Sequence, residues 1–235
     1  LTIGNGTDTA LLTHRDTPTG DTKVSYIDLS VASLEVQDNA SIDVSYKGYQ
    51  GGYAENTQFA GYGPGGGGSV SSSHRQNGGG HGGIGGRASA FNSPGATYGD
   101  QNAPIELGSG GGGRNTSSRG GDGGGAVKIT ATGDITVNGS IIADGNIAGI
   151  GGLYFGGGGA GGSIWLISGG TLAGNGVIQA DGGDRGSNTS DGGGGGGRIA
   201  LEYNAKTFSG TTSVTRGSGY NDLAVDGTIC ENGCP

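Results

Sequence analysis

Short stretches of alternating apolar and polar residues recur along the chain, and three of them follow directly on glycine runs. The glycine-rich segments 120–125, 156–162 and 192–197 open onto the alternating segments 126–130, 163–167 and 198–203. Alternation with a period of two, rich in Ile and Val, is typical of half-buried β-strands. Helical periodicity is absent, so the pattern predicts an all-β fold.

The alternating segments belong to a repeat of roughly 35–37 residues, a spacing typical of stacked repeat architectures. The first unit has strands at 126–130, 135–137 and 140–145, with turns at 132–134 and Asn138-Gly139. The second has strands at 163–167, 171–172 and 177–182, with turns at Ser168-Gly169-Gly170 and Asn175-Gly176. The third begins at Arg198 and ends near Gly217, and residues 31–48 and 225–230 resemble degenerate copies.

Three short strands joined by tight turns make one coil of a parallel β-solenoid, and single coils must stack to bury their inner faces. The residues predicted to point inward are Val127, Ile129, Ile135, Val137, Ile141 and Ala143, with Ile164, Leu166, Leu172, Ile178 and Ala180 above them. A β-sandwich of the same strands with glycine-rich insertions is the alternative. Asn-Gly turns favour that alternative, because they commonly close hairpins.

The chain divides by composition into three parts, which we expect to form one continuous domain. Residues 1–45 form an N-terminal β segment, with alternation at 23–31, 33–36 and 41–45. Residues 46–125 are rich in Gly and Tyr, and residues 126–235 carry the β-repeats and a C-terminal Cys loop. An unstructured insert of about 80 residues is improbable in a compact domain. We therefore predict packed glycine-rich layers in the middle part, resembling polyglycine II.

Composition and charge exclude several partner classes. Glycine accounts for 61 of 235 residues, the net charge is −8, and basic clusters are absent, which argues against nucleic acid as a partner. No apolar stretch is long enough to span a membrane. The chain lacks a recognisable signal peptide, which fits a mature exported chain or a fragment of a longer one.

The two cysteines, Cys230 and Cys234, flank Glu-Asn-Gly at the end of the chain. A disulfide across this tight loop is the favoured interpretation, with two free thiols as the alternative. A disulfide would indicate an oxidising compartment, so we expect an extracellular or cell-surface location.

Candidate catalytic and cofactor motifs are weak. The many G-x-G-x-x-G matches follow from composition and lack the strand–turn–helix context of a nucleotide site. His74 and His81 are expected to bond glycine-strand carbonyls, and Asp before Gly indicates turn chemistry. Asp181, Asp184 and Asp191 match no known calcium loop. We predict no catalytic residues, no cofactor and no metal site.

Aromatic residues in the glycine-rich part could stack on sugars. Tyr49, Tyr53, Phe59 and Tyr62 are spaced for display on a surface. The favoured alternative is that these rings cover glycine layers.

Several segments resemble a glycine-rich β-repeat module of large exported bacterial surface proteins. They are residues 42–49, 61–66, 80–83, 139–145 and 196–201, and their order matches the module. The glycine layers also resemble, more weakly, the polyglycine sandwiches of phage tail-fibre adhesins. The resemblance implies a secreted or surface location and a structural or adhesive role without catalytic residues.

These observations lead to one principal hypothesis. We expect a non-enzymatic extracellular structural protein whose copies assemble into a filament, sheath or matrix. The alternative is an adhesin or glycan-binding module that displays Tyr-rich glycine loops, with surface glycans as partners.

Overall fold

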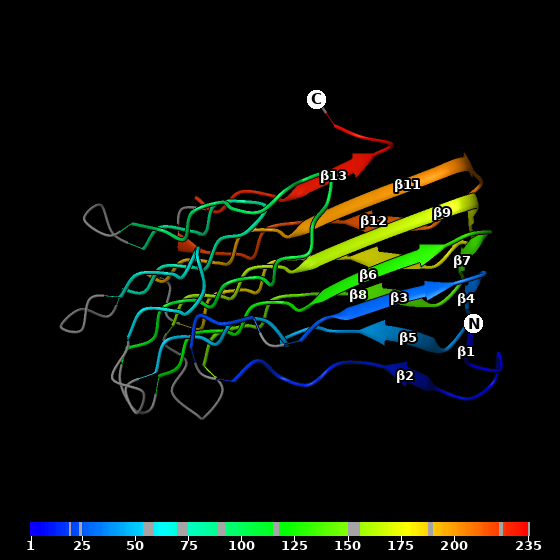
Figure 1. Cartoon of the computed structure of the whole chain (residues 1–235). Helices are drawn as coiled ribbons and strands as arrows, with labels where there is room; N and C mark the ends of the chain where they lie inside the picture. The colour runs from blue at the N-terminus through cyan, green and yellow to red at the C-terminus, as the bar shows by residue number, and fades with distance from the viewer. Residues whose placement is uncertain are drawn as a thin grey trace.

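The computed structural model is all-β, and no α-helix occurs among the residues that it describes (Figure 1). The described residues are 1–18, 20–23, 25–53, 59–69, 75–88, 93–114, 118–149, 156–187, 190–220 and 223–234. The strands gather at one end of the molecule, and glycine-rich backbone without regular strands fills the other end.

The strands are short, apart from β9 and β11. Their bounds are β1 Thr2–Ile3, β2 Ala10–Leu12, β3 Ile27–Val31, β4 Leu34–Val36, β5 Ala40–Asp43, β6 Ala126–Ala131, β7 Ile135–Val137, β8 Ser140–Ile142, β9 Ser163–Ala173, β10 Val177–Gln179, β11 Arg198–Lys206, β12 Thr211–Ser213 and β13 Thr228–Glu231.

The strands form two sheets in which every strand ladder is parallel. The larger sheet has the order β1-β4-β7-β9-β11-β13; β6 also pairs with β9, and β3 pairs with β6. The smaller sheet has the order β12-β10-β8-β5-β2. The chain passes from a strand of the larger sheet to one of the smaller sheet, then travels through the glycine-rich end before it returns.

The core lies between the two sheets, because alternate residues of each strand point inward. Val127 pairs with Ile164 and Ile164 pairs with Ile199, so like residues stack in register. All eleven residues predicted to point inward are at most 1% exposed and belong to this core. Burying an Ile or Leu side chain contributes about 1.5–3 kcal/mol, which makes this stack the main apolar stabilisation of the sheets.

One predicted turn is wrong. Ser168-Gly169-Gly170 does not turn, because β9 continues through these residues and pairs with both β6 and β7. The Gly170 N–H bonds to the carbonyl of Gly133 beneath it at 3.2 Å, in the segment that joins β6 to β7. Here the glycines allow β9 to cross closely over the loop between β6 and β7.

The hairpins that Asn-Gly turns would close are absent from the described strands. Asn138-Gly139 joins β7 in the larger sheet to β8 in the smaller sheet, and Asn175-Gly176 joins β9 to β10 in the same way. The turns therefore connect sheets and not neighbouring strands of one sheet.

Segments that lie far apart in the sequence are neighbours in both sheets. β3 pairs with β6, and β5 pairs with β8, so the N-terminal part continues directly into the repeat part. After β5, the next strand of the chain that the structure describes is β6.

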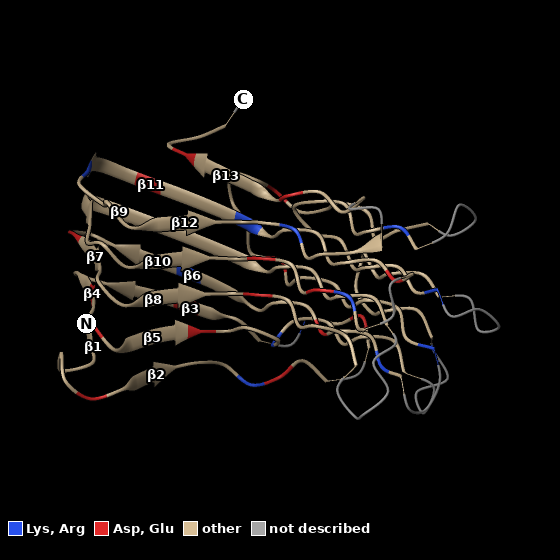
Figure 2. Ribbon diagram, turned by 180° about the vertical axis from the view of Figure 1, so that it is seen from behind, with Lys and Arg blue, Asp and Glu red and all other residues tan. Residues whose placement is uncertain are grey.

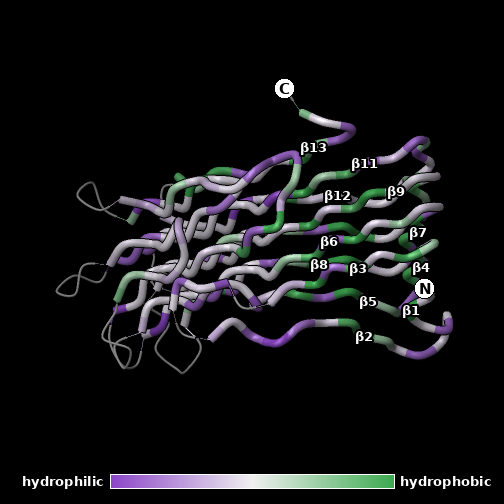
Figure 3. The backbone as a smooth tube through the Cα atoms, in the orientation of Figure 1, coloured by the Kyte–Doolittle hydropathy of each residue, from purple (hydrophilic) through white to green (hydrophobic). Residues whose placement is uncertain are grey.

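The glycine-rich end is a bundle of extended segments, which we call the glycine bundle. It consists of residues 48–52, 61–67, 78–86, 108–113, 120–125, 156–162 and 192–197. Figure 3 shows it as pale backbone, in contrast to the apolar strands.

Within residues 156–162, every third N–H bonds to the same neighbouring segment. Gly157 and Ala160 donate to residues 109–112, Gly158 and Gly161 to residues 192–195, and Gly159 and Gly162 to residues 143–146, all at 2.7–3.0 Å. A backbone with three residues per turn points successive N–H groups in three directions, which accounts for this pattern.

The neighbours approach too closely for side chains. A Cβ on Gly158 would overlap the carbonyl oxygen of Gly183, and one on Gly159 would overlap that of Asp122. Glycine is needed at these positions because of close approach, since neither residue has a positive φ.

Candidate binding groove

A groove of about 290 Å³ lies where β5 leads into the glycine bundle. Its walls come from separate parts of the chain, namely Asp16 and Thr17, residues 46–48 with Gln50, Arg119 with Asp122, and Asn146. The fold brings these segments together, although they are distant in sequence.

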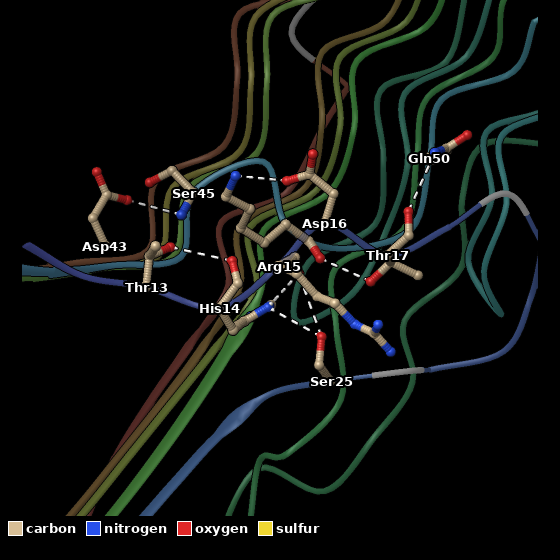
Figure 4. Close-up of polar contacts among 10 residues, drawn as sticks. Thr13, His14, Arg15, Asp16, Thr17, Ser25, Asp43, Ser45 and Gln50 are labelled. Atoms are coloured by element: carbon tan, nitrogen blue, oxygen red, sulfur yellow. Dashed lines mark hydrogen bonds and ion pairs between the residues drawn. The ribbon is translucent and has the colours of Figure 1, made fainter.

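One wall is held by contacts between residues 16–17 and 47–50 (Figure 4). Lys47 Nζ lies 2.6 Å from Asp16 Oδ1, and the Thr17 hydroxyl donates to the Lys47 carbonyl at 2.8 Å. Gln50 Nε2 donates to the Thr17 carbonyl at 3.2 Å. Thr17 is 1% exposed, so this wall is anchored to the body of the molecule.

The opposite wall is held by Asp122. Its Oδ1 lies 2.6 Å from Arg119 Nη2 and accepts the Gly51 N–H at 2.7 Å. Burial raises the pKa of Asp122 above its ordinary value, although the Arg119 guanidinium acts in the opposite direction. Each charged side chain of the two pairs therefore has its counter-charge within the groove itself.

Tyr46 lies on the rim of the groove with an unusual backbone. Its φ is 65°, and it is 49% exposed. Its N–H donates to the Asp144 carbonyl at 2.9 Å, which helps to fix this conformation. Burial raises the pKa of the phenol, and the nearby carboxylates of Asp144 and Asp43 raise it further. A bulky residue in the left-handed region is a costly feature that tends to occur at functional sites.

The sequence did not single out Tyr46. It is one of several tyrosines in the glycine-rich part. The local sequence Ser45-Tyr46-Lys47 does not predict a positive φ, because this conformation is usual only for glycine and asparagine. Its position three residues after the end of β5 is the signal that could have drawn attention to it.

Two of the four candidate stacking residues are buried. Tyr49 is 3% and Tyr62 is 7% exposed, and both pack with Leu107 and Ala126 in a separate apolar cluster. The glycine layers enclose both rings, which agrees with the favoured alternative that these rings cover the layers. Tyr53 and Phe59 are half-buried, and their role in ligand stacking stays a prediction.

His81 bonds to a carbonyl of a glycine-rich segment, as predicted from the sequence. Its Nδ1 lies 2.9 Å from the Gly161 carbonyl, so the N–H of the neutral ring is on Nδ1 and donates to that oxygen. Burial lowers the pKa of His81 to about 4, which keeps the ring neutral at ordinary pH. His74 lies outside the described residues.

The aspartates serve mainly as acceptors for neighbouring backbone. Asp144 Oδ1 accepts the Asp181 N–H, and Asp181 Oδ1 accepts the Thr215 N–H, at 2.7 and 2.6 Å. Figure 2 shows acidic residues where strands of the smaller sheet enter the bundle. Asp184 and Asp191 also bind backbone N–H groups, at Ser218, Gln76 and Gly156. These bonds link separate coils, which is a wider role than the turn chemistry expected from sequence.

Cys230 and Cys234 form the expected disulfide, with Cα atoms 5.4 Å apart. The loop between them contacts Asn102, whose Oδ1 accepts the Cys234 N–H at 2.7 Å. Asn232 donates its N–H to Leu201 of β11 at 2.9 Å. The disulfide loop therefore ties the last coil to β11 and to the glycine-rich part.

The described part of the chain contains no cluster of three His, Cys, Asp or Glu side chains suited to a metal ion. Within the same residues, no helix has the length and apolar character needed to cross a membrane. Comparison with known proteins gives no match to a family model, to a curated protein or to a solved structure.

Proposed function

We propose that this chain is a non-enzymatic structural subunit that assembles head to tail into an extracellular filament, sheath or matrix. The observation that carries the proposal is the presence of unpaired strand edges at both ends of the stack. Among the described strands, β2 pairs only with β5 and β3 only with β6, while β12 pairs only with β10 and β13 only with β11. Because all ladders are parallel, the last coil of one copy could continue into the first coil of the next.

Exposed apolar side chains lie at the same two ends. Leu1 and Leu11 are 51% and 65% exposed at the β2 end, and Val225 and Ile229 are 48% and 40% exposed at the β13 end. These ends lie on opposite sides of the stack in Figure 1. Open edges of this kind favour pairing with another chain, and head-to-tail contacts that do not close produce fibres.

The stack itself fits a parallel β-solenoid more closely than a sandwich of hairpins. Each coil contributes strands to both sheets and pairs in register with the coil before it, which supports this interpretation. The hydrogen-bond pattern with period three supports a polyglycine II-like arrangement of the glycine bundle. Both features fit the resemblance to exported glycine-rich modules.

An extracellular or cell-surface location belongs to the same proposal. The disulfide between Cys230 and Cys234 supports it, because such bonds persist in oxidising compartments. The alternative of Tyr-rich loops displayed as an adhesive tip has less support, since Tyr49 and Tyr62 are buried.

The test uses two variants that block opposite ends. Leu11→Lys places a charge on β2, and Ile229→Lys places one on β13. Both sites are exposed, so folding should be little affected. We expect filaments of the native chain by negative-stain microscopy and monomers of each variant. A mixture of the two variants should give 1:1 dimers in analytical ultracentrifugation, because each retains one free end.

Ile147→Lys is the matched control, since Ile147 is 52% exposed and lies between β8 and β9, away from both ends. It should assemble like the native chain. A native chain that stays monomeric at high concentration, or end variants that assemble normally, would overturn the proposal.

A further inference from the structure

The two ends of the stack differ in a complementary way. Each coil has places for three strands, and the strands of successive coils stack in three columns. The columns are β3-β6-β9-β11-β13, β1-β4-β7-β9-β11 and β2-β5-β8-β10-β12, where the long strands β9 and β11 serve the first two. Among the strands that the structure describes, β1 and β2 extend the second and third columns by one coil at one end, and β13 extends the first column at the other (Figure 1). Each end therefore carries the strands that the other end lacks.

Apolar side chains border the places without a strand. The apolar residues that are only partly buried against the core belong mainly to β2 and β3, and they are Ala10, Leu12, Leu29 and Val31. At the other end, Ile229 of β13 is in register with Ile199 of β11, yet Ile229 is 40% exposed and Ile199 is fully buried. These are core positions by register, so their side chains are exposed because their coil has no further strand to cover them.

We propose that β13 of one copy lies beside β1 and β2 of the next copy, so that the three strands form one complete coil shared by two chains. The shared coil presupposes the head-to-tail assembly proposed above and specifies which strands meet. β13 pairs with β3, the end of β11 with β1, and β12 with β2 of the next copy, all in parallel. Ile229 then completes a core layer together with Ile3 and Leu12 of that copy.

The disulfide loop leaves the place of β1 open. Elsewhere the chain passes from the first column into the second, as from β3 to β4 and from β6 to β7. Cys230 is in register with Ala200, on the face of the sheet opposite the core, and the Cys234 N–H donates to Asn102 at 2.7 Å. The residues after β13 therefore turn away from the second column, where β1 of the next copy is expected.

A charged pair lies at the same end of the stack. Lys206 and Glu231 are in register with Leu172 and Leu201, which are buried in the core. Lys206 Nζ lies 2.5 Å from Glu231 Oε1. The shared coil covers this pair, which carries no net charge. A buried ion pair adds little stability, but it can fix the register in which two elements meet.

The experiment traps the junction in the third column by disulfide crosslinking. The ladder of Leu11, Ser41, Ser140, Val177 and Thr211 places Leu11 opposite Thr211 of the preceding copy. Neighbouring strands lie about 4.8 Å apart, within the Cα–Cα range of a disulfide. Leu11→Cys and Thr211→Cys are made as separate chains, mixed, oxidised mildly and run on non-reducing gels. We expect at least about tenfold more crosslinked dimer from the mixture than from either variant alone, since only the mixture brings the two thiols within disulfide range.

Thr13→Cys is the matched control for Leu11→Cys. Thr13 is also exposed, but it lies two residues further along, a shift of about 6.6 Å, so its mixture with Thr211→Cys should give little dimer. A second measurement compares hydrogen exchange in native filaments and in monomeric Ile229→Lys. The N–H groups of β3 should be protected in the filaments, because β13 of the preceding copy pairs with that edge.

The outcomes separate the shared coil from assembly itself. A native chain that stays monomeric overturns both proposals. Filaments in which Leu11→Cys and Thr211→Cys give no more dimer than the Thr13→Cys control, or in which β3 exchanges as fast as in the monomer, overturn the shared coil and leave assembly standing.

Discussion

The imidazole of His81 lies between the glycine bundle and Tyr98, with the two ring centroids 4.8 Å apart. Its Nδ1 donates to Gly161, while its Nε2 is buried without a partner among the described residues. Burial is the main cause that lowers its pKa, and the positive charge of Arg198 adds to it. A proton on Nε2 would place a charge where no acceptor is available.

We therefore expect His81 to make the fold sensitive to acid. Its folded-state pKa is about 4, below the ordinary value of 6.5, so the unfolded chain binds the extra proton first as pH falls. The contribution of His81 to the free energy of unfolding should be fully present above pH 6.5, decline between pH 6.5 and 4, and level off below. Urea denaturation of the native chain and of His81→Gln between pH 3.5 and 8 measures it.

The quantity to compare is the difference in the free energy of unfolding between the native chain and His81→Gln at each pH, because acidic residues titrate in both proteins. That difference should shrink as pH falls through the window from 6.5 to 4. A difference that is constant with pH would contradict the burial of a neutral His81.

For individual residues, the sequence predicts which aliphatic side chains are buried, but not which aromatic rings are exposed. The alternating Ile, Leu and Val residues, such as Ile141 and Leu166, are buried as their period requires. Tyr49 and Tyr46 have similar sequence surroundings, yet one is enclosed and the other is half exposed. Which ring is covered depends on segments about 60 to 100 residues away in sequence, such as Leu107 and Asp144, and no local pattern encodes that.

Between elements, aspartate side chains join one coil to the next. Asp144 follows β8, and its carboxylate accepts the Asp181 N–H and the Gln179 side-chain amide from the coil of β10. Desolvation nevertheless raises the pKa of Asp144 to about 6. The bonds to the carboxylate offset only part of the cost of burying its charge.

Asp144→Asn should therefore stabilise the chain in a way that depends on pH. The folded-state pKa lies above the ordinary 3.8, so ionisation costs stability as pH rises from about 4 to 6. The variant keeps an acceptor for Asp181 without the charge. Its free energy of unfolding relative to the native chain should rise over this window and remain constant above about pH 6.5, as measured by urea denaturation.

Asp28→Asn is a suitable comparison, because the Asp28 side chain is 41% exposed in a loose ion pair with Lys128. Its effect on the free energy of unfolding should be small, because exposed ion pairs contribute little. If the Asp144→Asn difference falls with rising pH instead, the carboxylate is stabilised by its bonds and the burial argument fails.

The ends of the strands could be predicted where apolar and polar residues alternate clearly. They could not be predicted where glycine can serve either a turn or a close crossing of two segments. β6, β7, β8 and β10 begin at the predicted residues or within one of them. Ser168-Gly169-Gly170 has the composition of a turn, but it continues β9 over a loop of the coil below. Glycine allows either a turn or a close crossing of two segments. Which of the two forms depends on the segment packed against it, and the local sequence does not contain that information.

In the whole molecule, the sheets and the glycine bundle share continuous segments of chain. Residues 156–162 run directly into β9, 192–197 into β11 and 120–125 into β6. If one of these segments leaves the glycine bundle, the first residues of the strand that follows it are therefore released as well. This continuity implies that the two ends of the molecule unfold together, although one is apolar and the other is held by backbone hydrogen bonds.

Gly159→Ala tests this coupling from the bundle side. Its Cβ would overlap the Asp122 carbonyl, and backbone on that side has little freedom to move because Asp122 itself holds Gly51 and Arg119. Overpacking of this kind typically costs about 1–3 kcal/mol or more. We expect one cooperative transition at lower denaturant concentration, with hydrogen exchange accelerated in β9 and β11 as well as in residues 156–162.

Gly68→Ala is the control, since a Cβ there would lie 3.1 Å from its nearest neighbour, the Ser93 carbonyl, and could be accommodated by a small shift. Its exchange pattern should resemble that of the native chain. If Gly159→Ala instead frees only the bundle while β9 and β11 keep native protection, the two ends are separate folding units. The rigidity that a filament subunit needs would then come from the sheets alone, because the bundle could open without disturbing the strand edges through which we propose that copies assemble.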